Sequence, residues 1–146
     1  MKVLADSDAA AIDSRVVETT VAALNELPIP EMAYPQARRL PPHELRVYRV
    51  RAQVAQIIVE DDRDWHVVLR DSANPTATMI VEIPDPSCVT NQDHSARFSA
   101  ARDSLRLVPR AAMATFEGVG FFDFIHKQRG RARNGFELHP ILRIAR

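Results

Sequence analysis

The sequence has little cysteine, no long apolar run and no excess charge of one sign. Its single cysteine, Cys88, excludes an intrachain disulfide framework and any zinc site built from several thiolates. Because no basic residue adjoins Cys88 in the sequence, we expect it to be a small packed thiol. No apolar run approaches the roughly 20 residues of a membrane-spanning helix, and Asp6 and Asp8 interrupt any signal-peptide core. We therefore expect a cytoplasmic protein with no membrane partner.

The charges balance over the whole chain but not along it. The 146 residues carry 19 Lys+Arg and 19 Asp+Glu, which excludes a uniformly basic nucleic-acid binder and a protein with an acidic tail. Residues 1–100 nevertheless hold 10 basic and 15 acidic side chains, and residues 101–146 hold 9 and 4. Seventeen of the basic residues are arginine. Arginine suits bidentate contacts to phosphate or carboxylate, although a genomic base-composition bias gives the same ratio.

Hydrophobic spacing and proline content divide the chain near residue 45. Apolar side chains at helical spacing predict a helix over 15–26. Five prolines between residues 28 and 44 predict an extended connector that wraps over the domain behind it. We therefore expect an N-terminal helix and proline-rich segment over 1–44 and one main domain over 45–146.

Alternation of apolar and polar residues predicts five strands in the main domain. They cover 46–59, 64–70, 78–83, 112–124 and 136–144, with a helix over 95–107 between the third and the fourth. A slip in the alternation near Gln56 predicts a bulge, and Gly118 and Gly120 predict bending or close backbone approach. A mainly β, small α+β chain with the order β-β-β-α-β-β is typical of the OB-fold, a five-stranded Greek-key barrel. Another small α+β sheet is the alternative.

The same alternation predicts which polar side chains leave the core together. If the second hairpin turns about Asn74, His66 stands opposite Glu82. In OB topology the fifth strand runs beside the third, which adds Glu137 and His139. We expect these four residues to share one outer face, with Asp64 nearby. The expected core faces comprise Trp65, Val67 and Leu69; Met79, Val81 and Ile83; and Phe136, Leu138, Pro140, Leu142 and Ile144.

This polar face has a functional and a structural interpretation. His66, Glu82, Glu137 and His139 can act as catalytic acids and bases near neutral pH. Alternatively, His66, Glu82 and His139 can bind a divalent metal as cofactor. Either would suit a metal-assisted hydrolase of the phosphodiesterase type, by fold analogy alone. The structural alternative is a set of cross-strand hydrogen bonds and ion pairs on a solvated sheet, and no local ligand motif decides between them.

Two loops add further charged candidates. The loop before the fifth strand is basic, and in OB-folds this loop commonly contacts oligonucleotides or oligosaccharides. It predicts a nucleic acid or another polyanion as partner, with a solvated loop as the alternative. Its candidate binding residues are Lys127, Arg129, Arg131 and Arg133, with Asp123, His126 and Asn134 as other polar candidates. The acidic stretch 60–64 lacks the EF-hand pattern and is expected to be a solvated turn rather than a calcium site. The N-terminal segment is a candidate contact for a protein partner, which would make the chain an adaptor.

Several motifs resemble an uncharacterised bacterial protein family, many of whose members look secreted. They are VEDDRDWHVVLRD (59–71), TMIVEIPDPSCV (78–89), GVGFFDFIH (118–126) and NGFELHPIL (134–142). The resemblance implies a shared architecture and a shared polar site but no reaction. The polar positions that it implies are Glu60, Asp61, Asp64, His66, Glu82, Asp85, Asp123, His126, Asn134, Glu137 and His139. The stretch KQRGRAR at 127–133 departs from the family, which has a neutral loop there. The resemblance therefore implies no polyanion role.

Overall fold

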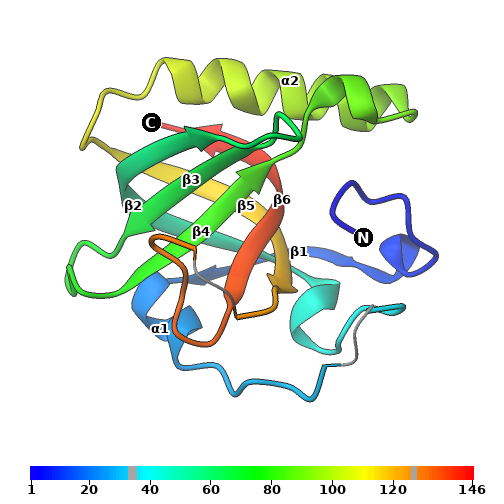
Figure 1. The fold of residues 1–146 in the computed structure, drawn as a ribbon, viewed down its shortest axis with the longest axis horizontal. Helices are drawn as coiled ribbons and strands as arrows, with labels where there is room; N and C mark the ends of the chain where they lie inside the picture. Colours follow the sequence, from blue (N-terminus) through cyan, green and yellow to red (C-terminus); the bar gives the residue numbers. More distant parts are fainter. Residues whose placement is uncertain (33–35, 126–127) are drawn as a thin grey trace.

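Five strands form a closed, OB-fold-like barrel in the computed structural model, which describes residues 1–32, 36–125 and 128–146 (Figure 1). The strands are β2 (Arg46–Val59), β3 (Trp65–Arg70), β4 (Thr78–Ile83), β5 (Met113–Phe122) and β6 (Phe136–Ala145). They pair in the order β2-β3-β4-β6-β5, and β5 pairs back to β2. β4 and β6 run parallel, and the other pairs within the barrel are antiparallel. The expected fold class is confirmed.

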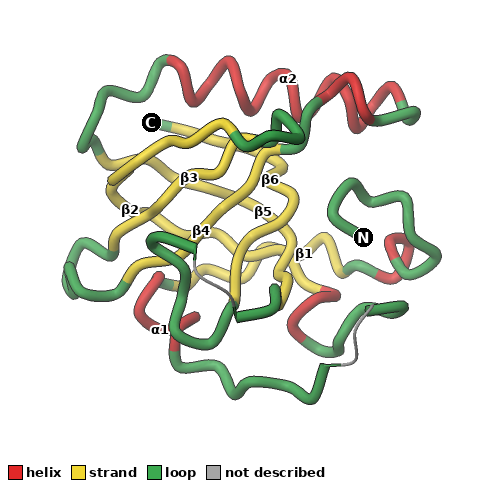
Figure 2. Tube along the Cα trace, viewed as in Figure 1, coloured by secondary structure: helices red, strands yellow, loops and turns green. Residues whose placement is uncertain are grey.

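Two helices cover the barrel at different sites. Helix α2 (Gln92–Arg106) runs along the top of the barrel in Figure 1 and buries Phe98, Ala101 and Leu105. The short helix α1 (Val21–Asn25) lies on the opposite side and buries Val21 and Leu24. Side chains from both helices join the apolar core of the barrel. Figure 2 shows the loop that leads into β6 passing in front of the sheet on a side that neither helix covers.

The predicted helix over 15–26 is wrong in its first half. Asp13–Thr19 forms strand β1, which pairs parallel to the start of β2, with Val17 opposite Tyr48. Val16 and Val17 are 36% and 37% exposed. Because β1 buries no apolar face, its sequence shows no alternation of apolar and polar residues. Backbone pairing with β2 decides its conformation instead. The helix begins only after Thr20, whose hydroxyl accepts a hydrogen bond from the Ala23 amide at 3.0 Å.

Register shifts set which side chains of β2 and β6 enter the core. The predicted slip in β2 is confirmed as an irregularity between Val54 and Gln56 in its pairing with β3. In β6 the expected core face is incomplete at its centre: Pro140 is buried as expected, but Ile141 is fully buried as well, and Leu142 is only partly buried. Two register shifts between β5 and β6 around Gly118 insert extra residues there and change the alternation.

Gly120 provides the close backbone approach that the sequence predicts. A Cβ atom at this position would lie 2.4 Å from the carbonyl oxygen of His43, closer than any real side chain can approach. Glycine is therefore required where β5 passes the 3-10 turn before β2.

The expectation that Cys88 is a packed thiol is wrong. Cys88 is exposed in the short 3-10 turn Pro86–Cys88 that follows β4. Its Sγ lies 3.9 Å from a guanidinium nitrogen of Arg63, a neighbour in space that sequence adjacency does not reveal.

The N-terminal segment is tied to the chain just before β2. Arg39 is 3% exposed, and its guanidinium donates to both carboxylate oxygens of Asp6 at 2.9 and 2.8 Å. Arg38 pairs with Asp8 at 2.6 Å. These contacts hold the first residues against the barrel, while the boundary near residue 45 stays a prediction. No helix among the described residues is long and apolar enough to cross a membrane.

Candidate functional site

Three neighbouring strands bring His66, Glu82, Glu137 and His139 together, and we call these four residues the polar cluster. His66 on β3 is in register with Glu82 on β4, and Glu137 on β6 is in register with Ile80 on β4. The predicted convergence on one face follows from these registers. The solvated character expected as the alternative is wrong, because all four side chains are buried.

Glu82 is the centre of the polar cluster. One of its oxygens lies 2.9 Å from Nδ1 of His139, and the other lies 3.3 Å from Nδ1 of His66. Nδ1 of His139 also lies 3.1 Å from a carboxylate oxygen of Glu137. His139 is therefore held between two carboxylates, one from a neighbouring strand and one from its own.

Burial and pairing oppose each other in setting the protonation states. Burial alone lowers the pKa of His139, but its contacts with Glu137 and Glu82 outweigh burial and raise the pKa to about 9. Burial alone raises the pKa of Glu82, but the two histidines hold it well below its usual range. For Glu137, burial dominates and raises the pKa. The pairing therefore favours a charged His139 beside an ionised Glu82.

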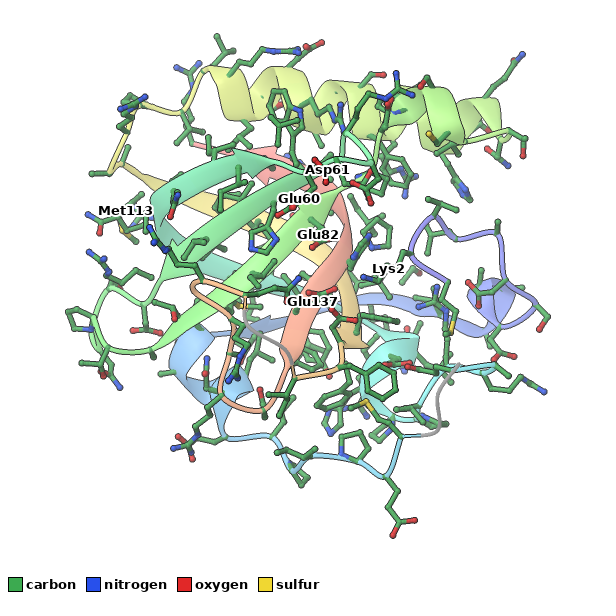
Figure 3. All side chains as sticks on the ribbon, viewed as in Figure 1. Lys2, Glu60, Asp61, Glu82, Met113 and Glu137 are labelled. Atoms are coloured by element: carbon green, nitrogen blue, oxygen red, sulfur yellow. The ribbon has the colours of Figure 1, made fainter. Side chains whose placement is uncertain are left out.

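The N-terminal segment and β5 cover one side of the polar cluster. The Lys2 ammonium lies 3.9 Å from Glu137 and 3.7 Å from Asp123. It also lies 5.3 Å from the centre of the Phe121 ring, which meets His139 edge to face. Figure 3 shows Lys2 beside Glu82 and Glu137, with Glu60 and Asp61 at the far edge of the same face. This cover joins parts of the chain more than 100 residues apart, so strand patterns could not predict it.

The polar cluster opens into a cavity of about 430 Å³, which we call the acidic pocket. Its lining consists of Lys2, Glu60, Asp61, Asp62, Asp64, Glu82, Asp123 and Gln128. Glu60, Asp61 and Asp62 are exposed at its rim, as a solvated turn requires. Asp64 is only partly exposed, and one of its oxygens accepts a hydrogen bond from the Asp85 amide at 2.7 Å. Burial, together with Asp62 and Glu82, raises the pKa of Asp64.

The loop between β5 and β6 is the basic loop, and its described residues 128–135 cross the outer face of β3. Gly130 lies directly on Val68, since a Cβ atom at Gly130 would be 2.3 Å from Cγ1 of Val68. This contact divides the face of β3 and β4 in two. The acidic pocket lies on one side of the crossing, and a second cavity lies on the other.

We call this second cavity, of about 520 Å³, the basic groove. It is lined by Ala22, Asn25, Glu26, Asn74, Thr76, Ala77, Thr78, Gln128, Gly130, Arg131 and Arg133. Arg131 is half-buried, whereas Arg129 and Arg133 are exposed. Arg133 pairs with Glu26 and donates to the carbonyl of Asn25 at 3.1 Å. Lys127 and His126, which the sequence also proposed for this loop, lie outside the described residues.

Arg70 is a candidate that the sequence interpretation did not assign to a site. It is exposed at the end of β3 and stands opposite Thr78, which lines the basic groove. Cross-strand partners project from the same face of a sheet. The strand alternation and the register were therefore sufficient signals for its assignment.

Asn134 is a structural residue rather than a residue of either cavity. It is buried, and its amide donates to the carbonyls of Leu24 and Leu27 at 2.8 and 3.0 Å. Its side-chain oxygen accepts from the Phe136 amide at 3.1 Å. Asn134 thereby fastens the basic loop to α1.

Similarity to solved structures extends to the fold. No protein-family model matches the chain, and no curated protein matches it significantly in sequence. A structure described as an aspartyl-tRNA synthetase from Leishmania major Friedlin aligns with 88% of this chain at 12% identity and a TM-score of 0.55. The matched part is 20% of that synthetase chain. An OBody bound to hen egg-white lysozyme aligns with 80% of this chain and 94% of its own, at 16% identity and a TM-score of 0.52. At these identities the similarity concerns the barrel alone, a fold compatible with a binding module.

Proposed function

We propose that this protein is a binding module for single-stranded nucleic acid, which it holds by the phosphate backbone in the basic groove. The observation that carries the proposal is the cavity of about 520 Å³ beside the basic loop, with Arg131 and Arg133 in its wall. Arg70, which stands opposite the groove residue Thr78, and Arg129, which adjoins the groove residue Gly130, add positive charge beside it. Arginine forms paired hydrogen bonds with phosphate, and the corresponding loop of other OB-folds is a common nucleic-acid contact.

The lining of the groove favours recognition of the backbone over recognition of bases. Beside its arginines, the groove offers amide and hydroxyl groups from Asn74, Thr76 and Gln128. Among the described residues that line it, none is aromatic, so the groove lacks the ring platforms on which bases stack in many OB-folds. We therefore expect oligonucleotides of different sequence to bind with similar affinity.

The proposal predicts a steep dependence of affinity on salt. Three phosphate contacts give a logarithmic slope of about −2 for a single strand, which corresponds to a loss of about twentyfold between about 50 and 200 mM NaCl. Fluorescence anisotropy with a labelled oligothymidylate and a labelled mixed-sequence strand measures both the slope and the sequence preference. The variant R129A/R131A/R133A should bind at least about tenfold more weakly at the lower salt and show a flatter slope.

A matched control separates the groove from net charge. The variant R51A/R97A/R110A removes the same charge from exposed sites on β2, on α2 and after α2. It should retain nearly all of the affinity. Equal losses in the two triple variants would contradict the proposal, as would a wild-type protein that binds neither strand at the lower salt. The hydrolase interpretation stays a prediction, because its chemistry requires a metal ion.

A further inference from the structure

We propose that Asp64, Glu82 and His139 bind a divalent transition-metal ion of the Zn²⁺ class at the inner end of the acidic pocket. Asp64 immediately precedes β3, Glu82 lies on β4 and His139 lies on β6. Each offers a ligand atom, and these atoms all lie within 4.8 Å of one another. A tetrahedral ion with bonds of about 2.0–2.2 Å holds its ligand atoms about 3.4 Å apart. Small side-chain rotations therefore complete the site.

The site differs from the one that the sequence predicts. The sequence pointed to His66, Glu82 and His139, whereas Asp64 takes the place of His66 in the structure. Because Asp64 lies outside β3, the alternation of the strand does not determine the direction of its side chain. The hydrogen bond from the Asp85 amide to its Oδ1 turns the carboxylate of Asp64 toward the pocket.

His66 provides an independent indication that this pocket accepts a ligand. It is 2% exposed, and neither of its ring nitrogens makes a well-aligned hydrogen bond. Nδ1 of His66 faces two carboxylates of the pocket lining, Glu82 at 3.3 Å and Glu60 at 3.5 Å. Buried polar groups are nearly always hydrogen-bonded in native proteins. Carboxylates that bind a metal are usually hydrogen-bonded by a neighbouring side chain. With a metal ion on Glu82, His66 would be that neighbour.

The chemistry of the donors selects the class of ion. One neutral imidazole and two carboxylates suit Zn²⁺ and its first-row neighbours, whereas Mg²⁺ and Ca²⁺ prefer oxygen ligands alone. His139 binds the ion only as the neutral imidazole, so the ion displaces the proton that the neighbouring carboxylates favour, and this proton is released to solvent. Three protein ligands leave at least one coordination position open toward the pocket. The exposed carboxylates of Glu60, Asp61 and Asp62 at the rim add a field that attracts cations.

Lys2 places a cation in the wall of the acidic pocket. Its ammonium contacts Glu137 and Asp123 and does not reach the three proposed ligands at ion-pair distance. It therefore leaves the ligands accessible but lowers the local attraction for a metal ion. Replacement by methionine keeps the apolar stem and removes the charge, so Lys2→Met should bind metal more tightly than the wild type.

The test uses Zn²⁺ and Co²⁺ alone, with chelator-treated full-length protein and no nucleic acid, so its outcome is independent of the proposed function. Isothermal titration should give one site for Zn²⁺, and Co²⁺ should produce the intense visible absorption of a low-coordinate site. Asp64→Asn keeps the acceptor for the Asp85 amide and should weaken Zn²⁺ binding by more than about 100-fold. Asp61→Asn removes the same charge from the rim and should change the affinity by less than about threefold.

Each alternative outcome contradicts the proposal. Equal losses in Asp64→Asn and Asp61→Asn would show diffuse attraction without coordination. Ca²⁺ binding as tight as Zn²⁺ binding would show that His139 takes no part. A Co²⁺ spectrum unchanged from that of the aqueous ion, or the absence of heat with Zn²⁺, would show that no site forms. Because Asp64 is partly exposed, the Asp64→Asn variant should fold, and its circular dichroism spectrum checks that it does.

Discussion

At the scale of single residues, most buried charges in this chain have an identifiable partner that offsets their desolvation. Asp71 is 5% exposed, and its carboxylate accepts hydrogen bonds from the amides of Ala22, Ala73 and Asn74 at 2.9, 2.9 and 3.0 Å. It thereby joins the turn after β3 to the first turn of α1. Glu44 has the same role between the connector and β5, through the Phe122 amide at 2.8 Å.

Asp71→Asn tests the pH dependence of this linkage. Burial raises the pKa of Asp71, but the backbone amides outweigh burial and lower it below the ordinary value of 3.8. A lowered carboxylate pKa contributes stability that is present above the unfolded-state pKa and is lost as pH falls through the folded-state pKa. We expect Asp71→Asn to lower the free energy of unfolding by about 2 kcal/mol at pH 7. The difference from wild type should shrink below about pH 3.8 in urea titrations, and a difference that grows on acidification would contradict this account.

At the scale of secondary-structure elements, the sequence predicted the strands whose burial produces an alternating pattern. It missed the strand whose conformation depends only on backbone pairing. The five barrel strands display alternation because each turns one apolar face into the barrel core, and even the bulge of β2 near Gln56 shows in its pattern. Strand β1 was missed because it lies on the edge of β2 with both faces largely exposed. The burial of Ile141 on β6 was missed because a bulge shifts the alternation at this point. A strict period-2 pattern cannot predict where such a shift occurs.

The basic loop provides a test at this scale through Gly130. This residue has a φ of +80° and touches Val68, so Gly130→Ala adds both backbone strain and a clash. We expect it to destabilise the protein by about 1–3 kcal/mol. In the double variant with Val68→Ala, the clash is relieved while the strain remains, so part of the loss should be recovered in thermal unfolding. A purely additive double variant would show that the loop does not pack on β3 at this point.

At the scale of the whole molecule, the position of the candidate site was predictable but its environment was not. His66, Glu82, Glu137 and His139 lie on adjacent strands, so strand order and register bring them together. Their burial depends on Lys2, Phe121 and the basic loop, whose positions follow from tertiary contacts between distant parts of the chain. The place of Asp64 among the proposed ligands depends on its hydrogen bond to a backbone amide in the loop after β4. No periodic sequence pattern predicts such a contact.

The crossing of the basic loop over β3 has a consequence for how the molecules behave in solution. It sets a positive groove and a negative pocket side by side on a chain of zero net charge, so each molecule is an electric dipole rather than a neutral particle. Dipoles attract one another when the solvent screens weakly, and the screening length falls from about 30 Å at 0.01 M salt to about 10 Å at 0.1 M. Light scattering should therefore give a negative second virial coefficient at low ionic strength that rises as salt is added. The R129A/R131A/R133A variant loses one pole and gains a net negative charge, so its copies should repel one another at low ionic strength and this repulsion should fade as salt is added.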